Sequence, residues 1–516
     1  MLAAPALTLN ADDGCPKVRI GGYIGERIDV CNRGMVLSRD VDELVEPFRH
    51  KDDTKSWSTE FIGKWMLGAM DMYRYNGDPA LLAKIEAGIR DLVSTQETDG
   101  FIGSYAPGAR LKHWDIWGRK YTALALLSYY DLTGDKAVLD AAARSIDCLI
   151  NDLESRDADI ARTGNYFGMA SCSVLEPVVW LYRETGEEKY LDFAGRIVES
   201  IEEEGSSQLI TKALEDIPVS ARSAFPKKWW SFENGMKAYE MMSCYEGLVE
   251  LGEVIGEEKY LLAARKTAES IVRDEINIAG SGAAFECWYM GRERQTIPSY
   301  HMMETCVTFT WMQFCARLLE KTGDAFYADQ FERTMYNALM ASMKADGSEI
   351  SKYSPLEGHR SAGEEQCGMH INCCNANGPR GFALIPRTAL TFNDNKASLN
   401  LWLPLEADFR AGRVNVGVNV ETAYPLDGNV NVTLHPARPV EFTLALRVPE
   451  WAGGIFNVTL NGEPQACTAI KGYVSLTRKW KDGDVVAISM DLRTRVVELN
   501  NMQAVLRGPL VFARAS

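Results

Sequence analysis

The sequence predicts a mainly α-helical protein with a β-rich C-terminal part: an (α/α)6 barrel joined to an antiparallel β-sandwich. A helix–turn–helix phrase with a central glycine recurs up to about Arg387 of the 516 residues. Beyond that point the pattern changes to alternating apolar and polar residues with turn signals. A chain of this length is also too long for one ordinary hydrophobic core.

The N-terminal segment VRIGGYIGERIDV, which begins at Val18, is interpreted as strands. We therefore assign residues 1–42 to the β-sandwich and begin the barrel near Glu43. The apolar start, Met1 to Leu9, carries no basic segment, and it leaves both a periplasmic and a cytoplasmic location open. No stretch of about eighteen apolar residues occurs, so we expect a soluble protein without a membrane span.

Residues 43–387 contain the repeat that predicts the barrel. Its five copies are centred on glycines: Gly77, Gly134, Gly186, Gly256 and Gly323. Each glycine stands where a left-handed residue ends a helix, and the acidic residue after it favours the N-terminus of the next helix. A sixth pair would close the barrel. The long connections 100–117, 209–230 and 353–373 favour a barrel whose loops build a pocket at one end.

Residues 388–516 are predicted to form the β-sandwich. Segments such as VNVGVNVETAYPLDGNVNVTL and EFTLALRVPEW alternate as half-buried strands do. The Asn-Gly at Asn461 and the Asp-Gly at Asp482 predict hairpins.

Charge and composition exclude some functions. The net charge of -16 argues against nucleic acid, because nucleic-acid binding requires Lys and Arg that neutralise phosphates. The 12 tryptophans suit the faces of sugar rings as well as they suit packing. We therefore expect no nucleic-acid partner and a small-molecule or glycan ligand.

Two short segments concentrate groups that could bind a metal. Glu304-Thr305-Cys306 opens the fifth hairpin, and Cys373-Cys374 precedes Asn375-Ala376-Asn377-Gly378-Pro379-Arg380. A carboxylate and three thiols give four donors, the number that a tetrahedral Zn²⁺ site takes. Adjacent cysteines are awkward joint ligands, so the spacing alone leaves buried structural cysteines as the alternative.

The chain resembles the bacterial β-L-arabinofuranosidases of glycoside hydrolase family 127. The segments that carry the resemblance are VRIGGYIGERID, DGFIGSY at Asp99, SVLEPVVWLYRETG at Ser173, METCVTFTW at Met303, the Cys373-Cys374 pair with Asn377 and Arg380, and LRGPLVF at Leu506. The resemblance implies an (α/α)6 barrel with β-sandwich domains, and a Zn²⁺ ion held by Glu304, Cys306, Cys373 and Cys374.

The resemblance also implies a retaining glycosidase in which Cys373 attacks the anomeric carbon. Only a thiolate is nucleophilic, and a metal holds a cysteine deprotonated near neutral pH. The family places its general acid one connecting loop upstream of Glu-Thr-Cys. Glu286 is the best match there, and Glu293 is the alternative.

Six further residues are candidates for substrate binding: His113, Arg119, Lys120, Trp230, His301 and His370. Where the family carries histidines on the approach to the second hairpin, this chain has His113 and then the cations Arg119 and Lys120. These cations predict an acidic sugar, unless they pair with Asp115 inside the fold. Trp229, Trp230 and Glu233, and the Tyr239-Glu240 pair, are expected near the pocket mouth, either on the sugar or in packing.

The leading functional hypothesis is an exo-acting glycosidase that releases an L-arabinofuranose-like or acidic furanose sugar from plant cell-wall glycans such as pectic side chains. A sugar lyase or epimerase is one alternative, since (α/α) barrels host those activities too. A non-catalytic glycan-binding protein with a structural zinc is another. The sequence leaves the oligomeric state open.

Overall fold

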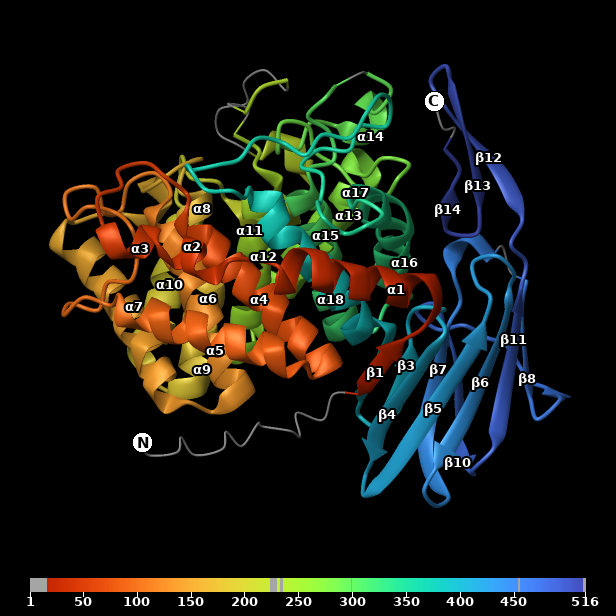
Figure 1. Cartoon of the computed structure of the whole chain (residues 1–516). Helices are drawn as coiled ribbons and strands as arrows, with labels where there is room; N and C mark the ends of the chain where they lie inside the picture. Colours follow the sequence, from red (N-terminus) through yellow and green to blue (C-terminus); the bar gives the residue numbers. More distant parts are fainter. Residues whose placement is uncertain (1–15, 223–229, 233–234, 298, 453–454, 514–516) are drawn as a thin grey trace.

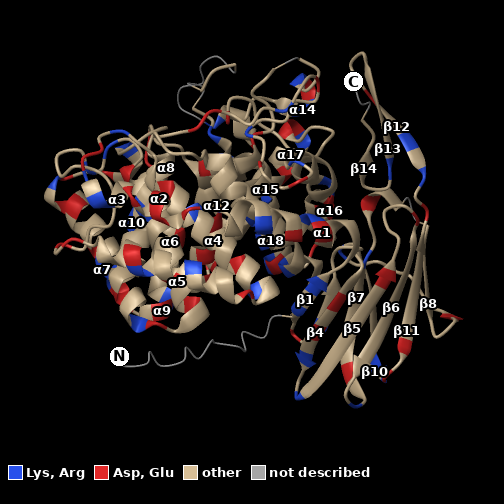
Figure 2. Cartoon of the chain, in the orientation of Figure 1, with Lys and Arg blue, Asp and Glu red and all other residues tan. Residues whose placement is uncertain are grey.

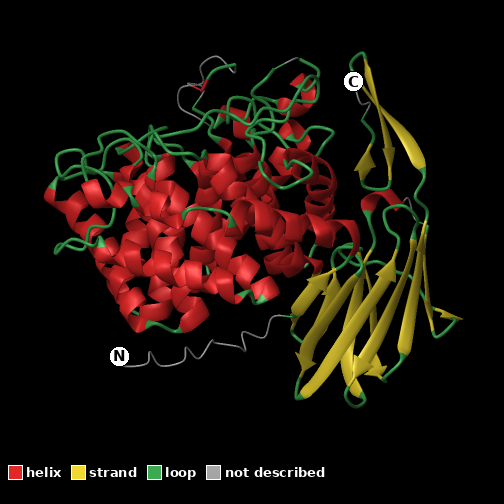
Figure 3. Cartoon of the chain, in the orientation of Figure 1, coloured by secondary structure: helices red, strands yellow, loops and turns green. Residues whose placement is uncertain are grey.

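The structure is a computed structural model that describes residues 16–222, 230–232, 235–297, 299–452 and 455–513. A helical body lies beside a β-rich body (Figure 1). Figure 3 shows the long loops gathered over one end of the helical body, while short turns occupy the opposite end. Among the described residues, no helix combines the length and the apolar character needed to cross a membrane.

Six helices form a closed inner ring. They are α4 (Thr59–Asn76), α6 (Asp115–Thr133), α9 (Leu175–Thr185), α12 (Ala238–Ile255), α15 (Thr305–Thr322) and α18 (Cys373–Ala389). Each inner helix contacts the next in this order, and α18 contacts α4. The predicted barrel is therefore confirmed, and its inner helices run in the same direction.

Outer helices pack against five members of this ring. They are α5 (Pro79–Ser94), α7 (Lys136–Ser155), α10 (Glu188–Glu202), α13 (Glu258–Ser270) and α16 (Ala325–Thr334). The sixth outer position is filled by α1 (Gly22–Cys31) and the π-helix η1 (Asn32–Leu37), which contact α18. The sixth pair thus joins the two ends of the helical region. Shorter helices decorate the loops: α2 (Val41–Val45), α3 (Pro47–His50), α8 (Met169–Cys172), α11 (Leu209–Leu214), α14 (Gly291–Arg294) and α17 (Met340–Ser342).

The hairpin turns have the predicted chemistry. All five glycines are left-handed, with φ angles between 62° and 71°. The Asp78 and Asp135 carboxylates cap the following helices by accepting from the backbone N–H of Ala80 and Ala137. These two features explain why each inner helix reverses at once into its outer partner.

The N-terminal segment is only partly a strand. β1 (Lys17–Ile20) pairs antiparallel with β4 (Leu405–Ala411), as predicted, but the residues from Gly22 onward form α1. The prediction of further strands there is wrong, because the apolar residues Ile24, Ile28 and Cys31 are buried and their spacing is helical. The domain boundary near residue 43 stays a prediction.

The sandwich consists of two sheets. The larger has the order β1-β4-β5-β6-β11-β8-β9 and the smaller β10-β7-β3-β2. Their remaining strands are β2 (Leu390–Asn393), β3 (Lys396–Leu399), β5 (Val414–Thr422), β6 (Asn429–Pro436), β7 (Val440–Arg447), β8 (Phe456–Leu460), β9 (Glu463–Pro464), β10 (Tyr473–Trp480) and β11 (Asp484–Met490). The pairing is antiparallel except between β3 and β7.

One of the two predicted hairpins is confirmed. Asn461, with φ 51°, turns β8 into β9. Asp482 instead lies between β10 and β11, which belong to different sheets, so its Asp-Gly turn links the two layers and the hairpin prediction there is wrong. The Asp-Gly sequence does form a turn at Asp482, as predicted, but a turn sequence does not determine whether the two flanking strands pair with each other.

A third sheet lies at the other end of the sandwich and reaches along the barrel (Figure 1). It consists of β12 (Thr494–Leu499), β13 (Met502–Arg507) and β14 (Leu510–Val511). Asn337 ties it to the barrel, because its side chain donates to the Pro509 carbonyl at 2.9 Å and accepts from the Val511 N–H at 2.9 Å.

Candidate active site

The long loops lie at the end of the barrel where the inner helices begin. Helix N-termini carry partial positive charge from their free N–H groups, so this end suits carboxylates and thiolates. Acidic residues occupy the first turn of four inner helices: Glu60, Asp115, Glu176 and Glu240. Figure 2 shows acidic and basic residues interspersed along the helices and loops of the helical body.

The predicted metal ligands meet between the first turns of α15 and α18. Glu304 is the N-cap residue of α15, and Cys373 is the first residue of α18. Their donor atoms and those of Cys306 and Cys374 all lie within 4.8 Å of one another, and all four residues are buried. The Cys374 Sγ lies 3.5 Å from the Cys306 Sγ and 3.6 Å from Glu304 Oε1.

The adjacent cysteines converge because they open a helix. The N-cap residue Asn372 accepts from the Asn375 N–H, and Gln366 Oε1 accepts from the Cys373 N–H at 2.9 Å. Both thiols then reach the same space, with Cys373 Sγ and Cys374 Sγ 3.9 Å apart. Three sulfurs and one carboxylate in a closed, buried group fit a borderline-soft divalent metal.

Electrostatics single out Cys373 within this group. Hydrogen bonds from Cys306 and Cys374 hold the pKa of the Cys373 thiol well below its ordinary value. Burial instead raises the pKa of Cys306 and Cys374 above theirs. Cys373 is therefore the thiol that most readily carries negative charge.

The loop that crosses the barrel end presents Glu286, with φ 66°, beside the thiols. Its carboxylate forms a short ion pair with Lys237, lies 3.4 Å from the Lys352 Nζ and accepts from the Tyr353 hydroxyl at 3.1 Å. Burial favours a higher pKa for Glu286, but the charges of the two lysines outweigh it and hold the pKa below its usual range. Glu293 lies exposed on α14, so of the two candidates the structure brings only Glu286 to the site.

The backbone of Lys352 connects Glu286 with the thiols. The carbonyl of Lys352 accepts from the Thr305 N–H at 3.0 Å and lies 3.8 Å from the Cys374 Sγ. Its ammonium faces Glu286, as described above. One residue thus fixes the carboxylate relative to the metal-ligand cluster.

His301 lies on the same side of the pocket. Its ring stacks on Phe285 with centroids 4.6 Å apart and meets the edge of Tyr353 at 4.9 Å. Burial and the charge of Lys352 lower the pKa of His301. The Phe232 ring contacts the rings of Phe285 and His301, so a cluster of aromatic side chains with one imidazole lies next to Glu286.

Sequence reasoning missed a buried ion pair and the rings of Trp117 and Tyr121 that lie beside it, whereas Tyr239 was expected near the pocket mouth. On α4, the Glu60 carboxylate lies 2.8 Å from the Lys64 Nζ and accepts from the indole N–H of Trp117. The Lys64 ammonium also lies 4.9 Å from the Tyr239 ring centre and 5.3 Å from that of Tyr121. A Glu and a Lys four residues apart in an otherwise apolar stretch were the available signal, because a buried ion pair is rare without a purpose.

His113 and His370 do not join the site. His113 is exposed, and its neighbour Trp114 is the residue that faces Lys237, whose ammonium lies 6.0 Å from the Trp114 ring centre. His370 is exposed on the outer surface, where its Nδ1 lies 2.9 Å from the Glu43 carboxylate. Closeness in sequence to the thiols misled the prediction for His370, because the chain turns at Asn372 into α18.

Arg119 is held inside the fold. Its guanidinium lies 2.9 Å from the Asp115 carboxylate and 2.7 Å from that of Asp152, and its side chain is 1% exposed. Phe101, from the DGFIGSY segment, packs its ring between Arg119 and Arg110 at 4.5 and 3.9 Å. Arg119 is therefore neutralised by carboxylates of the fold, as the alternative of internal pairing predicted.

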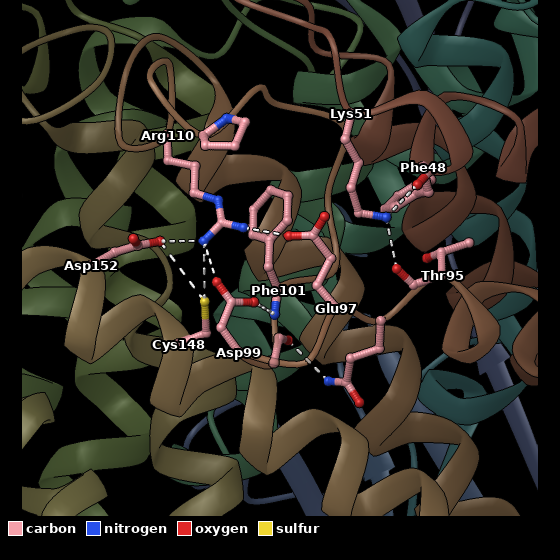
Figure 4. Close-up of polar contacts among 12 residues, drawn as sticks. Phe48, Lys51, Thr95, Glu97, Asp99, Phe101, Arg110, Cys148 and Asp152 are labelled. Atoms are coloured by element: carbon pink, nitrogen blue, oxygen red, sulfur yellow. Dashed lines mark hydrogen bonds and ion pairs between the residues drawn. The ribbon is translucent and has the colours of Figure 1, made fainter.

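The neighbouring Arg110 organises the loop that ends at Trp114 (Figure 4). Its guanidinium binds Glu97 at 2.6 Å and Asp99 at 2.7 Å, and it lies 3.8 Å from both Asp152 and the Cys148 Sγ. The DGFIGSY segment thus stabilises this loop, because its Asp99 and Phe101 side chains both contact Arg110.

Lys120 lies beneath the floor of the site. Its ammonium lies 3.7 Å from the Glu176 carboxylate and 4.9 Å from the ring centre of Trp117. It belongs to a buried polar group of the barrel interior that also contains Glu246 and Arg380. Trp230 is 53% exposed, whereas Trp229 and Glu233 lie outside the described residues.

Comparisons with known proteins show the family to which the chain belongs. Residues 23–387 match the family model described as the β-L-arabinofuranosidase GH127 catalytic domain, and residues 396–492 match the GH127 middle domain. A non-reducing end β-L-arabinofuranosidase of Bifidobacterium longum subsp. longum is 23% identical over 501 residues, which cover 87% of this chain and 74% of the relative.

Solved structures share the fold. A GH127 β-L-arabinofuranosidase from Geobacillus stearothermophilus T6 has a TM-score of 0.76 at 21% identity and covers 96% of this chain and 86% of its own. A second GH127 β-arabinofuranosidase also has a TM-score of 0.76, at 22% identity, and covers 96% of this chain and 84% of its own.

Proposed function

We propose a reaction for this chain on the premise that it belongs to glycoside hydrolase family 127, whose catalytic-domain model matches residues 23–387. The chain is a glycoside hydrolase. The proposal is that it is retaining and exo-acting, with Cys373 as nucleophile and Glu286 as acid/base. The observation that carries it is the buried group of Glu304, Cys306, Cys373 and Cys374 next to Glu286 at the open end of the barrel.

The proposed cofactor is Zn²⁺, held by these four residues. Three thiolates and one carboxylate fill a tetrahedral zinc site, and the donor atoms already lie within 4.8 Å of one another. When bound, the metal would supply positive charge that keeps the cysteines deprotonated near neutral pH. The remaining chemistry belongs to the protein side chains.

In the first step the Cys373 Sγ forms a bond to the anomeric carbon, and the bond from that carbon to the leaving oxygen breaks. Glu286 gives its proton to this oxygen. In the second step Glu286 takes a proton from water, the water oxygen bonds to the anomeric carbon and Cys373 leaves as the thiolate. The lysines around Glu286 favour its ionised form, which is the form that the second step uses. The proton that Glu286 takes from water in the second step is the one that it gives to the leaving oxygen in the first step of the next turnover.

The proposed substrate carries a non-reducing-end L-arabinofuranose-like sugar of plant cell-wall glycans, such as pectic side chains. The printed activity of the Bifidobacterium relative supports this choice. The acidic furanose of the sequence hypothesis loses its basis in Arg119 and Lys120, because both cations have carboxylate partners within the fold.

A panel of aryl glycosides tests the proposal, together with metal analysis of protein purified without added metal. We expect cleavage of the β-L-arabinofuranoside, a first-formed product that retains the anomeric configuration, and one Zn²⁺ per chain. Cleavage with inversion would contradict the cysteine nucleophile. Binding of glycans without turnover would favour a glycan-binding protein, and elimination or epimerisation products would favour the lyase or epimerase alternative.

A further inference from the structure

Glu240 is a buried carboxylate at the site that the proposed reaction does not use. It lies in the first turn of α12, directly after Tyr239, whose ring centre lies 4.9 Å from the Lys64 ammonium, and it is 3% exposed. Its Oε1 lies 3.7 Å from the Lys237 Nζ. Its Oε2 is buried and has no hydrogen-bond partner among the residues that the structure describes.

The neighbours of Glu240 place it between the Trp117 ring and the proposed acid, Glu286. Lys237, the N-cap residue of α12, pairs with Glu286, while Tyr239 packs its ring against Trp117 at 5.2 Å. The charges of Lys237, Glu286 and Lys64 all act on the Glu240 carboxylate. Burial raises its pKa, as expected of a group that lacks a full set of partners.

The other charges around the pocket are already matched. Lys64 pairs with Glu60, and Lys237 and Lys352 both face Glu286. Glu304 belongs to the metal-ligand cluster. Among the described carboxylates next to Glu286, the oxygen left without a partner is Oε2 of Glu240, which can accept a hydrogen bond and, as part of a carboxylate, repels a second negative charge.

We propose that Glu240 binds the sugar: its free oxygen accepts a hydrogen bond from one substrate hydroxyl, and its charge selects a neutral sugar over a uronic acid. The inference rests on the proposed function, because it needs a sugar in this pocket. Lys237 holds the other oxygen in place and thereby aims the free one. Glu240 is thus a specificity-determining residue, distinct from the nucleophile and the acid.

The test compares Glu240→Gln with the wild type on the aryl β-L-arabinofuranoside and on analogues that each lack one ring or side-chain hydroxyl. For the wild type, one analogue should lose roughly ten- to a hundredfold in kcat/KM, because a hydrogen bond to a charged group is lost. Glu240→Gln should lose a similar factor on the parent substrate and little more on that analogue. Equal losses on every substrate, or no loss, would overturn the proposal.

The matched control is Glu250→Gln, which removes a second buried carboxylate further along the same helix, where it pairs with Arg183 and Arg317. It should leave the hydroxyl discrimination of the wild type unchanged. Thermal unfolding of both variants checks folding. If Glu240→Gln fails to fold, the analogue series on the wild type still decides, because a uniform response to all deletions excludes a single critical hydroxyl.

Binding separates this proposal from the proposed function. If the enzyme does not cleave the arabinofuranoside, the proposed reaction fails. The Glu240 proposal is then tested through binding alone, by calorimetric titration with neutral monosaccharides and the corresponding uronic acids. In that titration the wild type should bind the neutral sugar more tightly than the uronic acid, and Glu240→Gln should reduce this difference in affinity. Tighter binding of the uronic acid by the wild type would contradict it.

Discussion

Cys373 and Glu286 reach the site from different kinds of backbone. Cys373 opens a helix, where the N-cap and the free N–H groups favour a thiolate. Glu286 stands on a loop in a left-handed conformation and is fixed by Lys237, Lys352 and Tyr353. The position of the proposed nucleophile, Cys373, is thus set by a helix, and that of the proposed acid, Glu286, by its side-chain neighbours.

Glu286→Gln should slow substrates with poor leaving groups far more than activated aryl glycosides, since only the former need a proton on the leaving oxygen. Kinetics on a series of leaving groups of graded acidity measures this. Glu293→Gln, on the exposed helix α14, is the control and should behave like the wild type. An equal loss on all leaving groups would assign Glu286 another role.

Glu275 supports the Glu286 loop from beneath. Its buried carboxylate accepts the backbone N–H groups of Tyr289, Met290 and Gly291 at 2.9 to 3.0 Å. Burial raises its pKa to about 7 despite these bonds. The protonation of Glu275 therefore changes with pH near neutrality, and with it the contribution of this loop anchor to the stability of the fold.

Because the folded pKa of Glu275 lies above the unfolded value, this group contributes most to stability at low pH. That contribution is lost as pH rises from about 4.5 towards 7. The midpoint of thermal unfolding of Glu275→Gln, measured from pH 5 to pH 8, should therefore fall less with pH than that of the wild type. Parallel curves for the two proteins would contradict the assignment.

Among the elements, five of the six inner helices were predictable, whereas α18 and the course of the pocket loops were not. The five hairpins with their glycines could be read from local sequence, because helix ends depend on neighbouring residues. Helix α18 and its partner α1 were missed as a pair, since they come from opposite ends of the helical region. The pairing of Arg119 with Asp115 was open to sequence reasoning, because the two residues stand four apart on one helix, whereas the second partner, Asp152, lies 33 residues away on α7.

The close approach of α4 and α6 gives a prediction at this scale. A Cβ at Gly63 would meet Tyr121 at 2.5 Å, including its backbone oxygen. Gly63→Ala should cost about 1–3 kcal/mol and disturb the neighbouring Lys64. Gly195→Ala, on α10 with open space around it, should instead stabilise by about 0.4–1 kcal/mol. Denaturant unfolding of the two variants compares them, and a similar effect of both changes would contradict the packing argument.

For the whole molecule, a buried ion pair joins the sandwich to the barrel. Arg447 of β7 is fully buried and binds Asp329 and Glu332 of α16, the latter at 2.5 Å. The hydroxyl of Tyr424 donates to Glu332 at 2.8 Å. The two bodies therefore share a polar junction that neither could satisfy alone.

Arg447→Ala should destabilise the protein by about 3–5 kcal/mol, because two buried carboxylates lose their counter-charge. Arg478→Ala, on the neighbouring strand β10 and partly exposed, should cost less than about 1 kcal/mol. Calorimetry measures both. An unchanged unfolding profile of Arg447→Ala would show that the junction does not hold the two bodies together.

The central claim is that Cys373 becomes covalently bonded to the sugar, and mass spectrometry of rapidly quenched enzyme tests it most directly. During turnover of an activated β-L-arabinofuranoside, the intact mass should rise by one pentosyl residue, and fragmentation should place it on Cys373. Cys373→Ala should show neither the adduct nor turnover. A sugar found on Glu286 or Glu304, or turnover by Cys373→Ala, would contradict the account.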